Sequence, residues 1–277
     1  MTDRLVRGIL TALTVLLILI AIFSLQWRMV HDTPVMFYLS FLIDRFHEVP
    51  YRDFFDENMP GVYLTYYLIG KVFGYTDLGF RCADMLCLAA ILAATWLWMR
   101  RIDRRAGWCG ALLFGLVYLG HGPIISLQKD YVILLPMVLA LLVASQLRLG
   151  IMVRSSLIGC LFGMCALIKP QAAIGLPLVL IFTIFDGGRE GRARFPWAGR
   201  LIGAAAVSLG GFSIPLIAAG LYLLRNDALG DFIDIARNYW PLYHELTGYK
   251  TIAKGYPRLR YLFWNYTMMG GNRIWLV

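Results

Sequence analysis

The chain has 277 residues, of which 59% are hydrophobic and only 16% are charged. Soluble domains carry about 25% charged residues, so this composition excludes an ordinary soluble domain and indicates an integral membrane protein. The net charge of +9 then requires no nucleic-acid partner, because basic residues in cytoplasmic loops account for it.

Seven apolar segments are each predicted to cross the bilayer as a helix, which takes about 20 mostly apolar residues. They are residues 8–26, 78–99, 107–124, 130–147, 156–168, 171–185 and 200–223. The fifth and sixth segments are short, and the Lys169-Pro170 pair between them predicts either a tight hairpin or one broken pair. The sequence therefore predicts an all-α polytopic membrane protein with about seven transmembrane helices.

Arginine residues are concentrated at the N-terminus and in alternate loops of this arrangement, where acidic residues are few. The positive-inside rule then predicts a cytoplasmic N-terminus. Residues 1–223 would form the membrane domain, with a large external loop at 27–77. Residues 224–277 would form an external segment. Because that segment ends on the apolar "NRIWLV", we expect a chain truncated before further spans.

The large external loop contains two segments with the pattern of helices that lie in the membrane interface. Residues 34–47 are mostly apolar, and residues 60–73 begin with a proline at a helix entrance and carry tyrosines that suit the headgroup level. Between them lies the charged stretch "HEVPYRDFFDENMPG", residues 47–61. It forms either one wall of a catalytic cavity or a solvated link whose charges only pair with one another.

Three charged residues stand next to predicted spans and are candidates for chemistry. Asp32 follows the first span and could act as a base, or it could cap the helix that Pro34 begins. Asp130 opens the fourth span, where a carboxylate also favours the positive end of a helix. Lys169, between two apolar runs, could bind a phosphate or extend its ammonium to the lipid headgroups.

The stretch from 31 to 85 resembles the integral-membrane glycosyltransferases of the GT-C superfold. Within them it is similar to the branch of protein O-mannosyltransferases and lipid A aminoarabinose transferases. It reads "HDTPVMFYLSFLIDRFHEVPYRDFFDENMPGVYLTYYLIGKVFGYTDLGFRCADM". The matching features are Asp32, "PYRDFF" at 50–55, "DENMP" at 56–60, "FG" at 73–74, and Arg81, followed later by Asp130 and Lys169. The resemblance covers most of residues 1–240.

The resemblance implies a polyprenyl-phosphate sugar donor, the bilayer that carries it, and inverting transfer to a lipid, glycan or protein acceptor on the outer face. Asp32 would be the base that activates the acceptor hydroxyl. The further catalytic candidates are Asp130, Asp56 and Glu57, and the substrate-binding candidates are Lys169, Arg52, Tyr51, Asp53, His31, Arg81 and Arg225. Carboxylates stabilise an oxocarbenium-like centre, and cations stabilise the departing phosphate, so these residue types suit the chemistry.

The chain departs from this family pattern in the charged link. Many relatives carry a lysine before the proline, where this chain has Asn58 and Met59. The first loop lacks an Asp-x-Asp pair, so no obligatory metal site is predicted, although Asp53 and Asp56 could hold a divalent cation. A transporter or flippase of lipid-linked intermediates is the alternative function, since it would need a similar cavity, and an inactive truncated fragment is a third.

Overall fold

The structure, a computed structural model, describes residues 3–146, 148–188 and 197–243. Within these residues the secondary structure is helical, apart from one isolated bridge between Pro50 and Phe54. The all-α prediction is therefore confirmed for the described part of the chain. The arginine-rich stretch at 189–194 lies outside the described residues. So do residues 244–277, which make up most of the segment predicted to be external.

Four described helices are long and apolar enough to cross a membrane. They are α1 (Asp3–Ser24), α4 (Asp77–Met99), α8 (Ile151–Ile168) and α10 (Trp197–Arg225), the last over Gly199–Arg225. They correspond to the first, second, fifth and seventh predicted spans. The protein is therefore a multi-pass membrane protein.

The other three predicted spans also coincide with helices, but these are shorter. They are α5 (Arg104–Gly120), α7 (Leu134–Ala144) with the short α6 (Lys129–Val132) before it, and α9 (Gly175–Gly188) after the 3-10 turn η2 (Pro170–Ile174). The count of seven spans therefore stays a prediction. Helices α8 and α9 pack against each other, so the chain at Lys169 forms a hairpin rather than one interrupted helix.

Two predicted boundaries are wrong, each for a local reason. Helix α8 begins at Ile151 rather than at 156, because the buried Arg154 donates from Nη1 to the carbonyl of Ala144 at 2.7 Å and is accommodated inside the helix. The fourth span is broken at Ile133, between α6 and α7. Pro136 explains this break, because its ring clashes with the carbonyl four residues earlier in a continuous helix.

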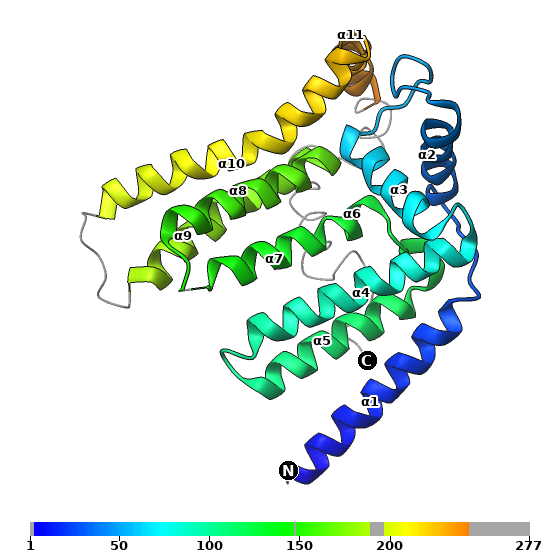
Figure 1. The fold of residues 1–277 in the computed structure, drawn as a ribbon. Coiled ribbons are helices and arrows are strands. Elements are labelled where there is room, and N and C mark those ends of the chain that lie inside the picture. The colour runs from blue at the N-terminus through cyan, green and yellow to red at the C-terminus, as the bar shows by residue number, and fades with distance from the viewer. Residues whose placement is uncertain (1–2, 147, 189–196, 244–277) are drawn as a thin grey trace, which may run out of the picture.

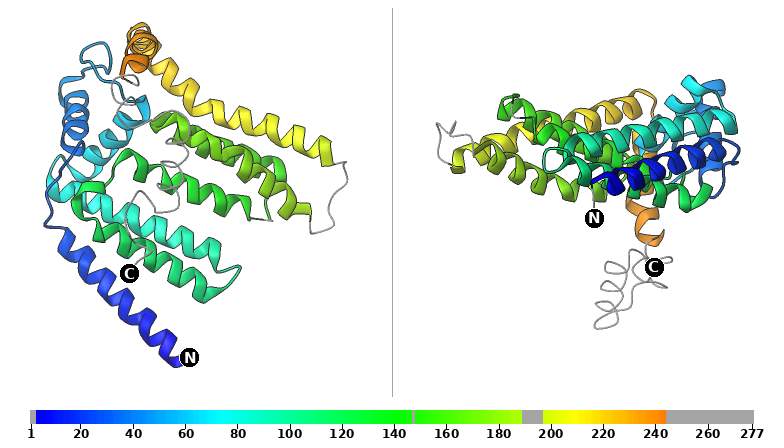
Figure 2. Two further views of the ribbon diagram at one scale, coloured as in Figure 1. Left: turned by 180° about the vertical axis from the view of Figure 1, so that it is seen from behind. Right: turned by 90° about the horizontal axis from the view of Figure 1, so that it is seen from below.

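The long helices lie side by side, and α8 packs most closely on α10 (Figure 1). Seen from below, they form a broad slab from which the described residues after α10, up to 243, project (Figure 2). Glycines permit the close approach of α8 and α10: a Cβ on Gly159 would lie 2.0 Å from the carbonyl oxygen of Ser208. Small residues at such a contact are typical of packing between membrane helices.

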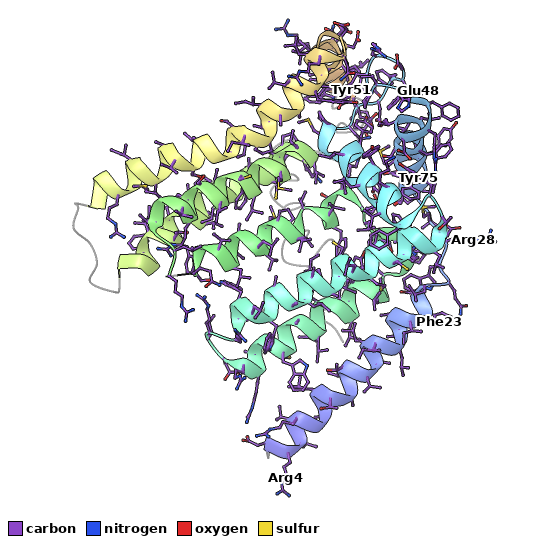
Figure 3. All side chains as sticks on the ribbon, in the orientation of Figure 1. Arg4, Phe23, Arg28, Glu48, Tyr51 and Tyr75 are labelled. Atoms are coloured by element: carbon purple, nitrogen blue, oxygen red, sulfur yellow. The ribbon has the colours of Figure 1, made fainter. Side chains whose placement is uncertain are left out.

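Three of the arginine-rich segments, within the described residues, meet at one end of the slab. Arg105 pairs with Asp3 at 2.7 Å, and Arg101 donates to the carbonyl of Ser145, so three of these segments are in contact. Arg4 lies at this end and Glu48 at the opposite end (Figure 3). These basic segments thus lie together at one end, as the positive-inside rule requires of cytoplasmic loops.

The two helices predicted in the external loop are found at the opposite end. Helix α2 (Thr33–Phe46) and helix α3 (Pro60–Phe73) match the predicted ranges to within one residue and pack against each other. Within the segment predicted to be external, the chain forms α11 (Leu229–Asp234), continued by the π-helical turn η3 (Ile235–Tyr239). That α2 and α3 lie in the membrane interface stays a prediction.

Candidate active site

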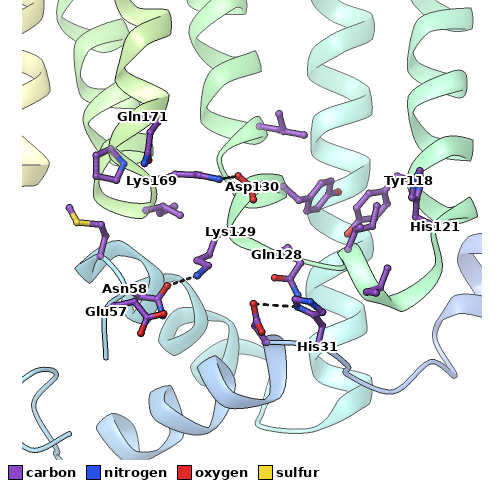
Figure 4. Close-up of a pocket in the computed structure, with 18 of the residues that line it drawn as sticks. His31, Glu57, Asn58, Tyr118, His121, Gln128, Lys129, Asp130, Lys169 and Gln171 are labelled. Carbon is purple, nitrogen blue, oxygen red and sulfur yellow. Dashed lines mark hydrogen bonds and ion pairs between the residues drawn. The ribbon is translucent and has the colours of Figure 1, made fainter. Parts of the chain in front are cut away.

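A cavity of about 970 Å³ lies at this end, where four segments converge (Figure 4). These are the turn between α1 and α2, the charged link, the α5–α6 loop and the turn after α8. Five predicted site residues line it, namely His31, Asp32, Glu57, Asp130 and Lys169. Apolar and aromatic side chains supply much of the remaining wall, among them Phe114, Tyr131, Ile168 and Trp240.

Asp32 stands immediately before α2, but its side chain makes no capping hydrogen bond. The capping alternative is therefore wrong for this side chain. Its carboxylate lies 3.3 Å from Nδ1 of His31 and is about half exposed, at 57%. The Thr33 hydroxyl does not cap the helix either, since it donates to the carbonyl of Ser126 at 3.4 Å. The Asp32 carboxylate is thus left available to the cavity.

Asp130 and Lys169 form an ion pair across the cavity wall (Figure 4). Asp130 lies in the first turn of α6, as the sequence predicts, and Lys169 follows the last residue of α8. The Lys169 ammonium therefore contacts a carboxylate, whereas the sequence analysis considered a phosphate or the lipid headgroups for it. The pair joins α6 to the turn after α8.

The charged link presents Glu57 to the cavity but turns Asp56 away from it. Asp56 is buried, and its Oδ1 accepts hydrogen bonds from the Nδ2 amide (2.8 Å) and the backbone N–H (3.3 Å) of Asn58. Above the link, the indole N–H of Trp240 donates to the carbonyl of Glu57 at 3.0 Å. Hydrogen bonds within the link and one from Trp240 therefore hold its conformation.

Three further predicted site residues lie outside the cavity lining, in a fixed turn of the same link. Arg52 pairs with Asp53 at 2.9 Å and donates to the carbonyl of Asn226 at 2.9 Å, which joins the link to the end of α10. The Arg52 hydrogen bond is the main cause that lowers the pKa of Asp53. The Tyr51 hydroxyl donates to the carbonyl of Asn58 at 2.6 Å, and burial raises the pKa of Tyr51. Arg52 and Asp53 therefore pair with one another, as expected if the link is solvated and its charges only pair.

Arg81 is fully buried beneath the cavity and acts on its walls through hydrogen bonds. Nη1 lies 3.1 Å from Oδ2 of Asp84 and also binds the hydroxyl of Ser126, while Nε and Nη2 donate to the carbonyls of Trp27 and Arg28 at 3.2 and 3.0 Å. It therefore ties the turn that carries Asp32 to the loop that precedes α6. Arg81 does not line the cavity, so this geometry gives it no direct contact with a substrate.

Two further hydrogen bonds hold the α5–α6 loop against α2 and α3. The Tyr66 hydroxyl donates to the carbonyl of Leu127 at 2.7 Å, and the Gln128 amide donates to the hydroxyl of Thr33 at 3.1 Å. Arg225, the last predicted site residue, ends α10 and lies outside the cavity lining.

The sequence analysis missed Lys129, Gln128 and Trp240, all of which line the cavity. A signal for Lys129 was present, because it stands beside Asp130 in a short loop between two apolar segments. Trp240 had no such signal, since it is one of many aromatic residues in the chain. Among the described residues, no group of three or more His, Cys, Asp or Glu side chains is arranged to hold a metal ion.

The site defines a class of protein: a helical membrane protein with a cavity that combines carboxylates, ammonium groups and apolar walls at one end of its bundle. The chain belongs to the dolichyl-phosphate-mannose-protein mannosyltransferase family, whose model matches residues 58–210, more than half of its length. The family is one of membrane glycosyltransferases that use a polyprenyl-phosphate-linked sugar donor. No curated protein and no solved structure matches the chain.

The matched range contains Arg81, Asp130 and Lys169 and begins after Asp32 and Glu57. The family therefore supports the resemblance stated for the sequence, while the narrower branch stays a prediction. For the residues before the range, the cavity itself is the evidence, because it places Asp32 and Glu57 in one wall with residues inside the range.

Proposed function

We propose that this protein moves a sugar, with inversion, from a polyprenyl-phosphate donor to a lipid, glycan or protein acceptor on the outer face of a bacterial plasma membrane. One observation supports this most strongly: Asp32, Glu57 and the Asp130–Lys169 pair, from four separate segments, line a single cavity. Residues 1–223 form the membrane domain in this proposal, and the chain from 224 belongs to the external side.

The proposed reaction needs a base, a carboxylate beside the sugar and cations beside the phosphate, and the cavity contains all three. Asp32 accepts the proton of the acceptor hydroxyl, whose oxygen forms the new bond to the anomeric carbon. The bond from that carbon to the phosphate oxygen breaks, and its electron pair leaves with polyprenyl phosphate. Glu57 stabilises the oxocarbenium-like centre, because carboxylates do so in glycosyl transfer generally. Cations of the cavity stabilise the negative charge on the leaving phosphate.

The outer-face assignment rests on the position of the cavity relative to the basic loops. The cavity lies at the end of Glu48 and α2, opposite the end that carries Arg4 and the Arg105–Asp3 pair (Figure 3). Cytoplasmic loops collect arginine and lysine, so the cavity end faces outward in this proposal.

The test is transfer of radiolabel by the full chain and by Asp32→Asn, each in nanodiscs with labelled polyprenyl-phosphate sugars and a membrane extract as acceptor. We expect the label to leave the lipid with the wild type and to stay on it with Asp32→Asn. Loss of a general base costs about 100-fold to 10,000-fold in rate. Asp231→Asn is the matched control, since Asp231 is exposed on α11 and lies outside the cavity lining.

The role of Asp32 as the base is wrong if folded Asp32→Asn transfers label as fast as the wild type. The transferase proposal itself fails if the wild type binds donor lipid but transfers none. In the second case, label that crosses the membrane without leaving its lipid would support the transporter alternative.

A further inference from the structure

Lys129 begins α6, one residue before Asp130, yet the two side chains point in different directions (Figure 4). Asp130 turns toward Lys169, whereas Lys129 turns toward the charged link and donates to Oδ1 of Asn58. Its side chain is partly buried and lines the cavity. The proposed reaction does not name the cation that meets the leaving phosphate.

The two ammonium groups that line the cavity differ in their partners. Lys169 is paired with Asp130. Lys129 forms no ion pair with any described residue, and its partner is the neutral amide oxygen of Asn58. A partly buried ammonium group without a carboxylate is costly to desolvate, and an anionic ligand removes that cost.

Asn58 is itself oriented by the buried Asp56, which accepts from its Nδ2 amide at 2.8 Å. This bond leaves Oδ1 of Asn58 directed at Lys129, so the amide positions the ammonium. An ammonium has three donors, and Asn58 takes one of them. The others are free to serve an oxyanion in the cavity.

We infer that Lys129, held by Asn58, binds the phosphate of the polyprenyl-phosphate donor and of the released carrier lipid, while Lys169 is paired with Asp130. This inference rests on the proposed function and narrows it. The neighbouring wall residues Met59, Leu134 and Ile168 are apolar, which suits the first part of the lipid tail beside the phosphate.

The contact between Lys129 and Asn58 also provides a charge-relocation test. Exchanging the two residues, in Lys129→Asn with Asn58→Lys, moves the ammonium to the link while its amide partner moves to α6. Because the two side chains touch, the relocated ammonium reaches the same part of the cavity. A purely structural role of the original pair does not predict recovery of phosphate binding in this double variant.

The measurement is the affinity of polyprenyl phosphate for the full chain in phosphatidylcholine nanodiscs, with inorganic phosphate as a separate ligand. We expect Lys129→Gln to weaken the lipid phosphate by about 10-fold or more, as for loss of a hydrogen bond between charged groups. The exchanged variant should recover most of this loss. Lys71→Gln is the matched control, since Lys71 pairs with Asp44 outside the cavity lining.

The two proposals fail in distinguishable ways. If Lys129→Gln is folded and binds polyprenyl phosphate like the wild type, or if only Lys169→Gln loses binding, this inference is wrong and the transferase proposal stands. If Asp32→Asn still transfers sugar while Lys129→Gln loses lipid affinity, the role of Asp32 is wrong and this inference stands. If the wild type binds inorganic phosphate as tightly as polyprenyl phosphate, the cavity is a general anion site rather than a lipid-phosphate site, and this inference is wrong.

Discussion

Arg81→Met tests whether the buried cluster beneath the cavity holds the site together. Both side chains of the Arg81–Asp84 pair are 0% exposed, and their closest atoms are 3.1 Å apart. Methionine keeps much of the apolar volume but leaves the Asp84 carboxylate without its cation. Removal of one partner from a buried pair costs about 3–5 kcal/mol. The Tyr118 hydroxyl still donates to Oδ1 of Asp84 at 2.5 Å, so we expect the lower end of that range.

A loss of about 3 kcal/mol shifts the unfolding equilibrium by roughly a hundredfold. The assay is unfolding of the purified protein in mixed micelles, followed by loss of helical circular dichroism. Adding Asp84→Asn to Arg81→Met should recover much of the stability, because it removes the unpaired buried charge. Arg105→Met is the control: Arg105 and Asp3 are 46% and 66% exposed, so loss of that pair should have no measurable effect.

The reasoning is refuted if Arg81→Met is no less stable than Arg105→Met, or if the added Asp84→Asn brings a further loss. A second readout separates positioning from stability. At a temperature where Arg81→Met is folded, kcat of transfer should fall while donor affinity changes less, because Arg81 holds the carbonyl of Arg28 near the Asp32 turn.

Two further predictions concern packing and pH. Gly159→Val should separate α8 from α10 and destabilise the fold, because even a Cβ would lie 2.0 Å from the Ser208 carbonyl oxygen; a thermal melt beside Gly150→Val, at a position with open space, checks this. The Arg52 hydrogen bond lowers the pKa of Asp53 below its ordinary 3.8, so its small stabilising contribution is complete above that value. It is lost as the pH falls through the lowered pKa, and Asp53→Asn should remove that acid-dependent step from melting temperatures measured down to pH 2.

Much of the fold follows from local patterns that the sequence displays. Apolar length locates the helices, and the prolines at positions 34 and 60 mark where α2 and α3 begin. The two boundary errors have different causes. The charge of Arg154 indicates the end of an apolar span, but the Ala144 carbonyl gives it a buried partner inside α8. The break at Ile133 had a local signal in Pro136, which the apolar pattern around it concealed.

The sequence predicted which residue types form the site, but not which side chains pair with one another. Carboxylates and ammonium groups next to predicted spans identified Asp32, Asp130 and Lys169, which do meet in one cavity. The ion pair between the last two depends on how the helices between them return the chain, which no local pattern specifies. Asn58, a departure from the family pattern in the sequence, is the residue that holds Lys129 in the structure.

The hydrogen bonds between the cavity walls bear on the choice between transferase and transporter. Tyr66 joins α3 to the α5–α6 loop at 2.7 Å, and Trp240 joins the chain after α10 to the link at 3.0 Å. Arg81 joins α4 to the turn before α2 and to the same loop. A transporter that opened the cavity by separating these walls would break such bonds in every cycle. A transferase keeps them and gains from them, because a fixed wall holds the acceptor, the sugar and the phosphate in reactive geometry.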